Sequence, residues 1–145
     1  MKGVILALLL ALSGAEAGMP PGLVTNVIDG DTLEVDGTRV RLIGVSVPEL
    51  KSVVPCAKYW AQEAFRYVAG RVLGRQVRIE TDVERTDRFG RRLAYVWIDG
   101  EMLQELLIRQ GLGRAVDSGQ NRKYRTRLVD LDRQAAQEQA GMHRP

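Results

Sequence analysis

The sequence contains a single cysteine, Cys56, and a single histidine, His143, among its 145 residues. One cysteine cannot build an internal disulfide framework, so the fold has to be stabilised by its core. Because His143 is the only histidine available as a base, a cysteine–histidine nucleophile is not expected. Cys56 is interpreted as a small packed residue or a free thiol, and His143, close to the C-terminus, is expected at the surface.

No apolar run is long enough to cross a membrane. The run at residues 4–12 has nine apolar residues, whereas a membrane-spanning helix needs about 20. Lys2 precedes the run and Ala15-Glu16-Ala17 follows it, which is the pattern of a secretory signal peptide. Residues 1–17 are therefore expected to be a cleaved signal peptide. The mature chain would then be secreted or periplasmic, without attachment to a membrane.

Proline and glycine are scattered rather than clustered. Five prolines and fifteen glycines do not form a low-complexity linker. A composition of 45% hydrophobic and 27% charged residues excludes a disordered tail or a collagen-like chain. The sequence predicts one domain at residues 23–143, preceded by a short irregular arm at 18–22.

Lysine is scarce, with 4 residues against 17 arginines, and the net charge is +3. The arginine guanidinium is suited to bidentate phosphate contacts. A mildly basic chain rich in arginine is compatible with a polyanionic partner.

Short β-prone segments alternate with turn signals along the chain, and helical periodicity appears in three places. Asp36-Gly37 is a strong hairpin signal because both residues tolerate positive φ. Gly74 and Gly111 each end a helix. The predicted strands span residues 23–28, 32–35, 40–44, 77–80 and 93–98, and the predicted helices span 57–73, 102–110 and 124–135.

This order of elements predicts an α+β protein that is mainly a β-barrel. Five short strands, with a helix between the third and the fourth, match the five-stranded Greek-key barrel called the OB-fold. Barrels of this kind bind single-stranded nucleic acid on a strand face and its loops.

Three segments carry residues suited to chemistry. The first holds Asp29 and Asp31 around a glycine turn, the second delivers Arg41 and then Glu49, and the third is an arginine-rich loop at residues 85–95. Each alone is typical of a solvated turn or loop. Together they supply a carboxylate for a hard cation, a carboxylate that accepts a proton and two guanidiniums for a phosphate. This combination indicates metal-assisted phosphodiester hydrolysis.

These segments, their order and the helix between them resemble the staphylococcal nuclease (thermonuclease) family over residues 23–142. The most specific stretch is Arg-Thr-Asp-Arg-Phe-Gly-Arg-Arg-Leu-Ala-Tyr at 85–95, and residues 107–112 are also similar to the family. The resemblance implies an OB-fold barrel with three helices. It also implies an enzyme that hydrolyses phosphodiester bonds of DNA and RNA with calcium and leaves 3′-phosphate ends.

The resemblance also implies roles for individual residues. Asp31 corresponds to a calcium-ligand aspartate, and Glu49 to the glutamate that activates the attacking water. Arg41 corresponds to the arginine that binds the scissile phosphate, and Arg91 to the arginine that stabilises the charged transition state. Arg88 and Phe89, in the loop before Arg91, are expected to bind substrate.

The metal site departs from the family at Ser46, which stands where the family has a second ligand aspartate. Val47 can still offer its backbone carbonyl. Because calcium affinity depends on ligand charge, the site is expected to bind calcium more weakly. Another divalent cation, magnesium first, is the alternative. Val116 and Ser118 occupy the region where the type enzyme has nucleotide-packing tyrosines.

Three functions therefore stay open. The first is a secreted, calcium-dependent nuclease, with DNA or RNA, preferably single-stranded, as its substrate and a monomer as its active form. The second is a non-catalytic nucleic-acid-binding domain, because Ser46 replaces a metal ligand. The third is an interaction module for a peptide or sugar, which rests on the fold alone.

Overall fold

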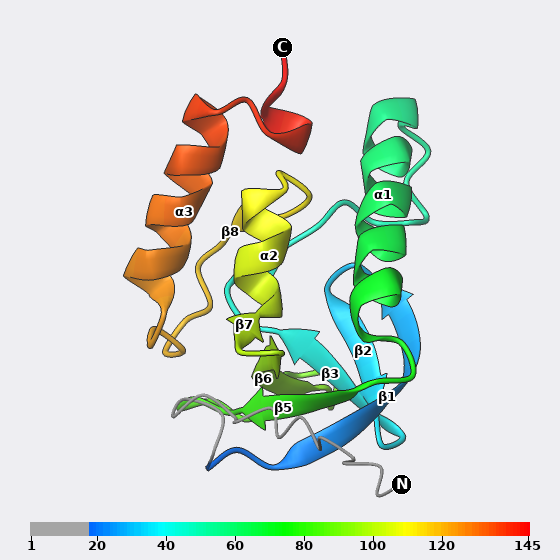
Figure 1. Cartoon of the computed structure of the whole chain (residues 1–145), viewed down its shortest axis with the longest axis vertical. Coiled ribbons are helices and arrows are strands. Elements are labelled where there is room, and N and C mark those ends of the chain that lie inside the picture. Colours follow the sequence, from blue (N-terminus) through cyan, green and yellow to red (C-terminus); the bar gives the residue numbers. More distant parts are fainter. Residues whose placement is uncertain (1–17) are drawn as a thin grey trace, which may run out of the picture.

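The structure is a computed structural model that describes residues 18–145, and the predicted signal peptide at 1–17 lies outside the described residues. Figure 1 shows the strands gathered at one end of the molecule and the helices at the other. The elements in chain order are β1 (Pro21–Asp29), β2 (Thr32–Val35), β3 (Thr38–Leu42), β4 (Val45–Ser46), α1 (Pro55–Val72), β5 (Gln76–Glu80), β6 (Arg92–Ile98), β7 (Glu101–Met102), α2 (Leu103–Arg109), β8 (Arg114–Ala115), α3 (Arg125–Gln137) and the 3-10 helix η1 (Gly141–His143).

The five longer strands form a closed barrel. The main sheet has the order β3-β2-β1-β5-β6-β7, and β3 pairs again with β6. That closing pair is parallel, with Val40 opposite Arg92 and Leu42 opposite Ala94. The predicted α+β class and five-stranded OB-fold barrel with three helices are therefore confirmed.

Two hairpin turns follow from their sequences. Asp36 and Gly37, between β2 and β3, have φ angles of 49° and 79°, and Asp99 and Gly100, between β6 and β7, have 51° and 79°. Positive φ at both central residues twists the turn to match the right-handed twist of the strands. The first turn confirms the predicted hairpin, and the second leads into the short strand β7, which was not predicted.

The helices pack against one end of the barrel, and Figure 1 shows α2 between α1 and α3. α1 begins at Pro55, whose missing N–H costs nothing in the first turn. The core is apolar and continuous from the barrel into the helices. Its fully buried members include Val24, Leu33, Val68, Val96, Leu103, Leu107 and Ile108.

The start of the barrel differs from the prediction. Residues 18–22 were expected to be an irregular arm, but β1 already begins at Pro21. Pro21 lies opposite Arg78 and Gly22 opposite Val77 of β5. Proline is tolerated here because it is the first residue of the strand. The two-residue strands β4 and β8, which pair with each other, are too short to give a sequence signal.

The prediction that His143 lies at the surface is wrong. Its side chain is only 8% exposed, and its ring Nε2 lies 3.0 Å from Oδ1 of Asp132 on α3. The N–H of Met142 also donates to the carbonyl of Gly111 at 2.9 Å. A partner distant in the chain thus fixes the C-terminal segment, and position in the sequence cannot reveal such a partner.

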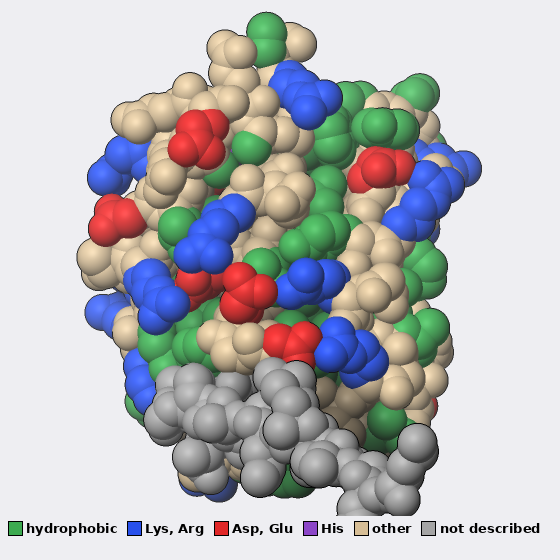
Figure 2. All heavy atoms as spheres, in the orientation of Figure 1, with side chains coloured by type: hydrophobic (Ala, Val, Ile, Leu, Met, Phe, Trp, Pro, Cys, Tyr) green, Lys and Arg blue, Asp and Glu red, His purple; other side chains and the backbone are tan. Residues whose placement is uncertain are grey.

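The outer surface is mixed in charge. Figure 2 shows acidic and basic side chains interspersed over the face that carries the helices, with hydrophobic side chains between α1 and α2. Cys56 is an exposed free thiol. Within residues 18–145, no helix combines the length and the apolar character needed to span a membrane.

Candidate active site

The barrel brings Arg41 and Arg91 to one outer face, although they are distant in the sequence. Arg41 of β3 lies opposite Leu93 of β6, and Arg91 stands two residues before Leu93, so both arginines follow the same side of the sheet. The alternate residues Val40 and Leu42 point into the core. Arg41, Leu93 and Arg91 line one groove of about 340 Å³.

Arg41 is held in a fixed conformation at the end of β3. Its Nη1 donates to the carbonyls of Leu42 at 2.6 Å and Val45 at 2.9 Å. Its Nη2 lies 3.3 Å from Oδ2 of Asp31. Its Nε–H has no hydrogen-bond partner among residues 18–145, which leaves a donor for a phosphate oxygen.

Arg91 is fixed by Asp87, which lies in the same arginine-rich loop. Its Nε donates to Oδ2 of Asp87 at 2.7 Å, while Oδ1 accepts the backbone N–H groups of Phe89 at 2.9 Å and Arg91 at 3.0 Å. Burial raises the pKa of Asp87, but these contacts outweigh it and the net pKa is lowered. The terminal nitrogens of Arg91 have no partner in the described part of the chain.

Arg88 and Phe89 extend the arginine-rich loop into solvent. The Phe89 ring is exposed. The guanidinium carbon of Arg88 lies 4.8 Å from the ring centre, and that of Arg91 lies 5.3 Å away. An exposed aromatic ring beside two guanidiniums is suited to stacking a base.

Asp31 lies at the start of β2, and its side chain is 11% exposed. Its backbone N–H donates to Oδ1 of Asp29 at 3.0 Å, and its Oδ2 accepts the N–H of Val47 at 3.3 Å. Burial, reinforced by Asp29, raises the pKa of Asp31 to about 6 despite the nearby Arg41. The surrounding protein therefore destabilises the charged form of Asp31.

The donor set around Asp31 fits a hard cation in kind. It offers the carboxylate of Asp31, with that of Asp29 beside it. Val47, whose N–H donates to Asp31, and its neighbour Ser46 carry further oxygen donors. Residues 18–145 contain no group of three or more histidine, cysteine, aspartate or glutamate side chains arranged to hold a metal.

Glu49 lies after β4, in the segment that leads to α1. Its side chain is 70% exposed, and Oε2 lies 3.5 Å from Nζ of Lys51. Within the described residues, no hydrogen bond or ion pair joins it to Arg41, Asp31 or Arg91. The structure therefore brings together the two arginines and Asp31, and it leaves Glu49 exposed beside Lys51.

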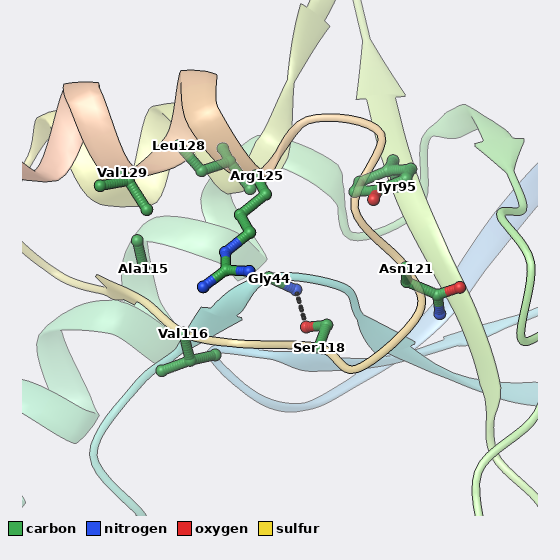
Figure 3. Close-up of a pocket in the computed structure, with 9 residues that line it drawn as sticks. All are labelled: Gly44, Tyr95, Ala115, Val116, Ser118, Asn121, Arg125, Leu128 and Val129. Carbon is green, nitrogen blue, oxygen red and sulfur yellow. Dashed lines mark hydrogen bonds between the residues drawn. The ribbon is translucent and has the colours of Figure 1, made fainter.

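The wall opposite the arginines is formed by residues 116–121. The Ser118 hydroxyl accepts the N–H of Gly44 at 2.8 Å, the contact dashed in Figure 3. The Asn121 side chain accepts the N–H of Glu84 at 2.8 Å and donates to its carbonyl at 2.9 Å. This wall is thereby joined both to the end of β3 and to the arginine-rich loop.

Two residues that shape the site were not predicted from sequence. Asp87 precedes Arg91 by four residues within a loop, and an acid at that spacing from a phosphate-binding arginine is a signal that could have indicated it. Asn121 carries no comparable signal, because its contacts with Glu84 join segments far apart in the chain.

Comparison with known proteins finds relatives that are named nucleases. A thermonuclease of Staphylococcus hyicus is 40% identical over 117 residues, which is 77% of this chain and 69% of that protein. A thermonuclease of Staphylococcus intermedius is 39% identical over 122 residues, 81% of this chain and 72% of that protein. Endonuclease YncB of Bacillus subtilis is 37% identical over 92 residues, 60% of this chain and 44% of that protein.

The family described as staphylococcal nuclease homologue matches residues 39–144. This range contains both groove arginines, the loop that carries Arg88 and Phe89, and the segment with Ser46 and Glu49. On the strength of this match and of the two thermonucleases, the chain belongs to the staphylococcal nuclease family.

Proposed function

We propose that this protein is a nuclease that hydrolyses phosphodiester bonds of DNA or RNA with the help of a divalent cation. Relatives named thermonuclease and endonuclease support a phosphodiester hydrolase. The observation that carries the proposal is the placement of Arg41 and Arg91 in one groove, beside the buried Asp31. Two fixed guanidiniums on one face are suited to clamping a single phosphate.

Each of these residues has a separate role in the proposed reaction. Arg41 and Arg91 bind the non-bridging oxygens of the scissile phosphate and stabilise the charge that grows on them. Glu49 accepts a proton from water as the water oxygen bonds to phosphorus. The bond between phosphorus and the 5′ oxygen breaks, and that oxygen takes up a proton from solvent, which leaves a 3′-phosphate and a 5′-hydroxyl. A bound divalent cation would add positive charge beside the same phosphate.

The proposed cation ligands are Asp31, Ser46 and Val47. Calcium is the first candidate, because oxygen donors and a flexible geometry suit it, and magnesium is the second. The substrate phosphate contributes negative charge and so strengthens cation binding where the family's second aspartate is missing. Cation affinity is therefore expected to rise when nucleic acid is bound.

The setting of the reaction is also part of the proposal. The leader pattern at residues 1–17 supports export, so the enzyme would act outside the cell or in the periplasm. The exposed Phe89 ring supports a single-stranded substrate, because its bases are free to stack. We expect the protein to act as a monomer, since the groove is built from a single chain.

A second candidate function is favoured by Ser46. A neutral hydroxyl in place of a ligand carboxylate leaves a site that binds phosphate through arginines without a firmly held cation. Such a protein would bind nucleic acid without cleaving it, and its affinity would fall steeply with salt.

The test is hydrolysis of single-stranded DNA by the mature chain over a calcium titration, repeated with magnesium, alongside Arg91→Ala and Ser46→Asp. Turnover that saturates with the cation and is lost in Arg91→Ala is the expected result. Arg144→Ala, a loss of charge far along the chain from the groove, serves as the matched control. An inactive wild-type protein with an active Ser46→Asp variant would overturn the proposal in favour of the binding function.

A further inference from the structure

The arginines of this chain differ in whether they have an acidic partner. Ten of the seventeen have a carboxylate within 4.0 Å among residues 18–145. Two more, Arg78 and Arg122, donate to backbone carbonyls. The guanidinium groups with neither kind of contact in the described residues belong to Arg39, Arg85, Arg88, Arg92 and Arg144. Four of these five lie on β3 or in the segment that leads into β6, beside the candidate active site.

Arg39 is placed by the barrel to continue the active-site face. It precedes Arg41 by two residues on β3, so the two Cα atoms are about 6.8 Å apart and both side chains leave the same side of the sheet. Val40 pairs with Arg92, the first residue of β6, so Arg39 lies beside Arg91, which immediately precedes that strand. The site arginines and Arg39 therefore form one basic row across β3 and β6.

The neighbours of Arg39 leave its charge available. Glu34 lies opposite it on β2, but Oε1 of Glu34 accepts a hydrogen bond from the Thr25 hydroxyl at 2.9 Å. No carboxylate of residues 18–145 lies within 4.0 Å of the Arg39 guanidinium. An exposed arginine without an acidic partner is free to exchange its counterions for a phosphate.

The groove also has acidic lining residues. Asp87 is paired with Arg91, and Glu84 and Asp117 lie with the wall at residues 116–121. Asp117 is exposed, and its nearest cation, Arg125, lies 4.0 Å away. Asp117 repels phosphates, whereas Arg39 attracts them, so charge favours a backbone path that continues from Arg41 toward Arg39.

We propose that Arg39 forms a further phosphate-binding subsite, which holds the backbone of a single-stranded polynucleotide one step beyond the scissile phosphate. The inference rests on the proposed function, because the scissile phosphate is the one placed between Arg41 and Arg91. Arg88, beside the Phe89 ring, flanks the same path. The subsite favours substrates with several phosphates over a dinucleotide, which has only one.

The test compares a labelled oligothymidylate of about 16 nucleotides, the upper site size of an OB-fold, with the dinucleotide thymidylyl-thymidine. The variants are Arg39→Gln, the charge-retaining Arg39→Lys, and Arg144→Gln, a matched loss of one unpaired arginine elsewhere. Binding of the oligonucleotide is followed by fluorescence anisotropy with the cation chelated, over a salt series. Hydrolysis of both substrates is measured separately with the cation present.

Arg39→Gln is expected to raise the Kd for the oligonucleotide about fivefold at 0.1 M salt. It should also flatten the slope of log affinity against log salt by about 0.7, which is the value for one phosphate contact with a single strand. Its loss in kcat/KM should be about fivefold greater on the oligonucleotide than on the dinucleotide, whereas Arg39→Lys keeps the wild-type slope. Equal effects of Arg39→Gln and Arg144→Gln would overturn the subsite. Hydrolysis that fails in every protein, with the binding difference intact, would instead overturn the nuclease and leave the subsite standing.

Discussion

Nε of Arg91 lies 2.7 Å from Oδ2 of Asp87, and the other oxygen of the same carboxylate accepts the backbone N–H of Arg91 at 3.0 Å. One aspartate therefore fixes both the loop and the guanidinium that the loop presents. Because Nε is engaged, the terminal nitrogens of Arg91 are the ones left for a phosphate.

The first prediction concerns Asp87 as a positioning residue. Asp87→Asn keeps one oxygen for the backbone N–H groups but turns an amide toward Nε of Arg91. We expect kcat on single-stranded DNA to fall about tenfold to a hundredfold, because displacing a group with the role proposed for Arg91 by about 1 Å costs that much. Steady-state kinetics with the saturating cation would measure it, with KM for the cation expected to stay unchanged.

Asp130→Asn is the matched control, since Asp130 forms a similar ion pair with Arg133 on the exposed face of α3. It should leave kcat unchanged. If Asp87→Asn lowers only the free energy of unfolding and not kcat, Asp87 has no positioning role.

The second prediction follows from the lowered pKa of Asp87 in the folded protein. A carboxyl group whose pKa is lower in the folded state stabilises the fold above its unfolded pKa, about 3.9, and this contribution is lost as the pH falls through the folded pKa. The difference in free energy of unfolding between wild type and Asp87→Asn should be constant from pH 7 to pH 5. It should shrink below about pH 4, as urea titrations across this range would measure. A difference that grows on acidification contradicts the ion pair.

The third prediction concerns the cation. Ser46→Asp adds a carboxylate to the donor set around Asp31, so the calcium concentration for half-maximal activity should fall about tenfold. Isothermal titration in the absence of nucleic acid should show the same direction of change. Thr126→Asp, which adds the same charge on exposed α3, should leave the midpoint where it is. An unchanged midpoint in Ser46→Asp would mean that this position does not contact the cation.

The fourth prediction concerns a buried acid that joins β5 to α3. Oε1 of Glu80 accepts the Trp97 indole N–H at 3.0 Å and the Tyr124 hydroxyl at 2.9 Å, and Lys123 forms an ion pair with Oε2. Glu80→Ala should lower the free energy of unfolding by about 2–4 kcal/mol, because it leaves buried donors unsatisfied. Glu101→Ala, which breaks only the exposed pair with Arg71, should cost less than about 1 kcal/mol. Similar losses in the two variants would show that the Glu80 cluster is weak.

The fifth prediction separates backbone strain from steric contact. Gly111 and Gly74 both have positive φ, +66° and +74°, but a Cβ at Gly111 would lie 2.1 Å from the carbonyl oxygen of Ala140, whereas nothing lies within 4 Å at Gly74. Gly74→Ala should therefore cost only the backbone term, about 1–2 kcal/mol. Gly111→Ala should cost clearly more and should loosen the C-terminal segment, as hydrogen exchange at Met142 would report. Equal costs would mean that the segment moves aside freely.

The local features of the fold follow from local sequence. Alternating apolar residues predict the first three strands, and Asp36-Gly37 predicts the turn between two of them, because positive φ is a property of those residue types. The apolar stripe of α1 predicts that helix to within two residues at its start. Strand β1 begins earlier than expected because Pro21 is paired through β5, a segment far away in the chain.

The sequence predicts which residues belong to the candidate site, but it does not predict how they are arranged in space. The resemblance to a known family names Arg41, Arg91 and Asp31, and the barrel brings them together. The partners that fix them, Asp87 and the Val47 backbone, arise from turns and register that the sequence pattern does not specify. Glu49 stays a prediction as the acceptor of the water proton.

The groove is complete only when β3 pairs with β6, with Val40 opposite Arg92 and Leu42 opposite Ala94. We expect this parallel pairing to form late in folding. Contacts between segments so far apart in the chain form after the local hairpins, because closing a long loop carries an entropic cost. Until these two strands meet, the guanidiniums of Arg41 and Arg91 have no fixed separation and no common face. We therefore expect a partly folded chain to lack the proposed phosphate site, which would form only when the barrel closes.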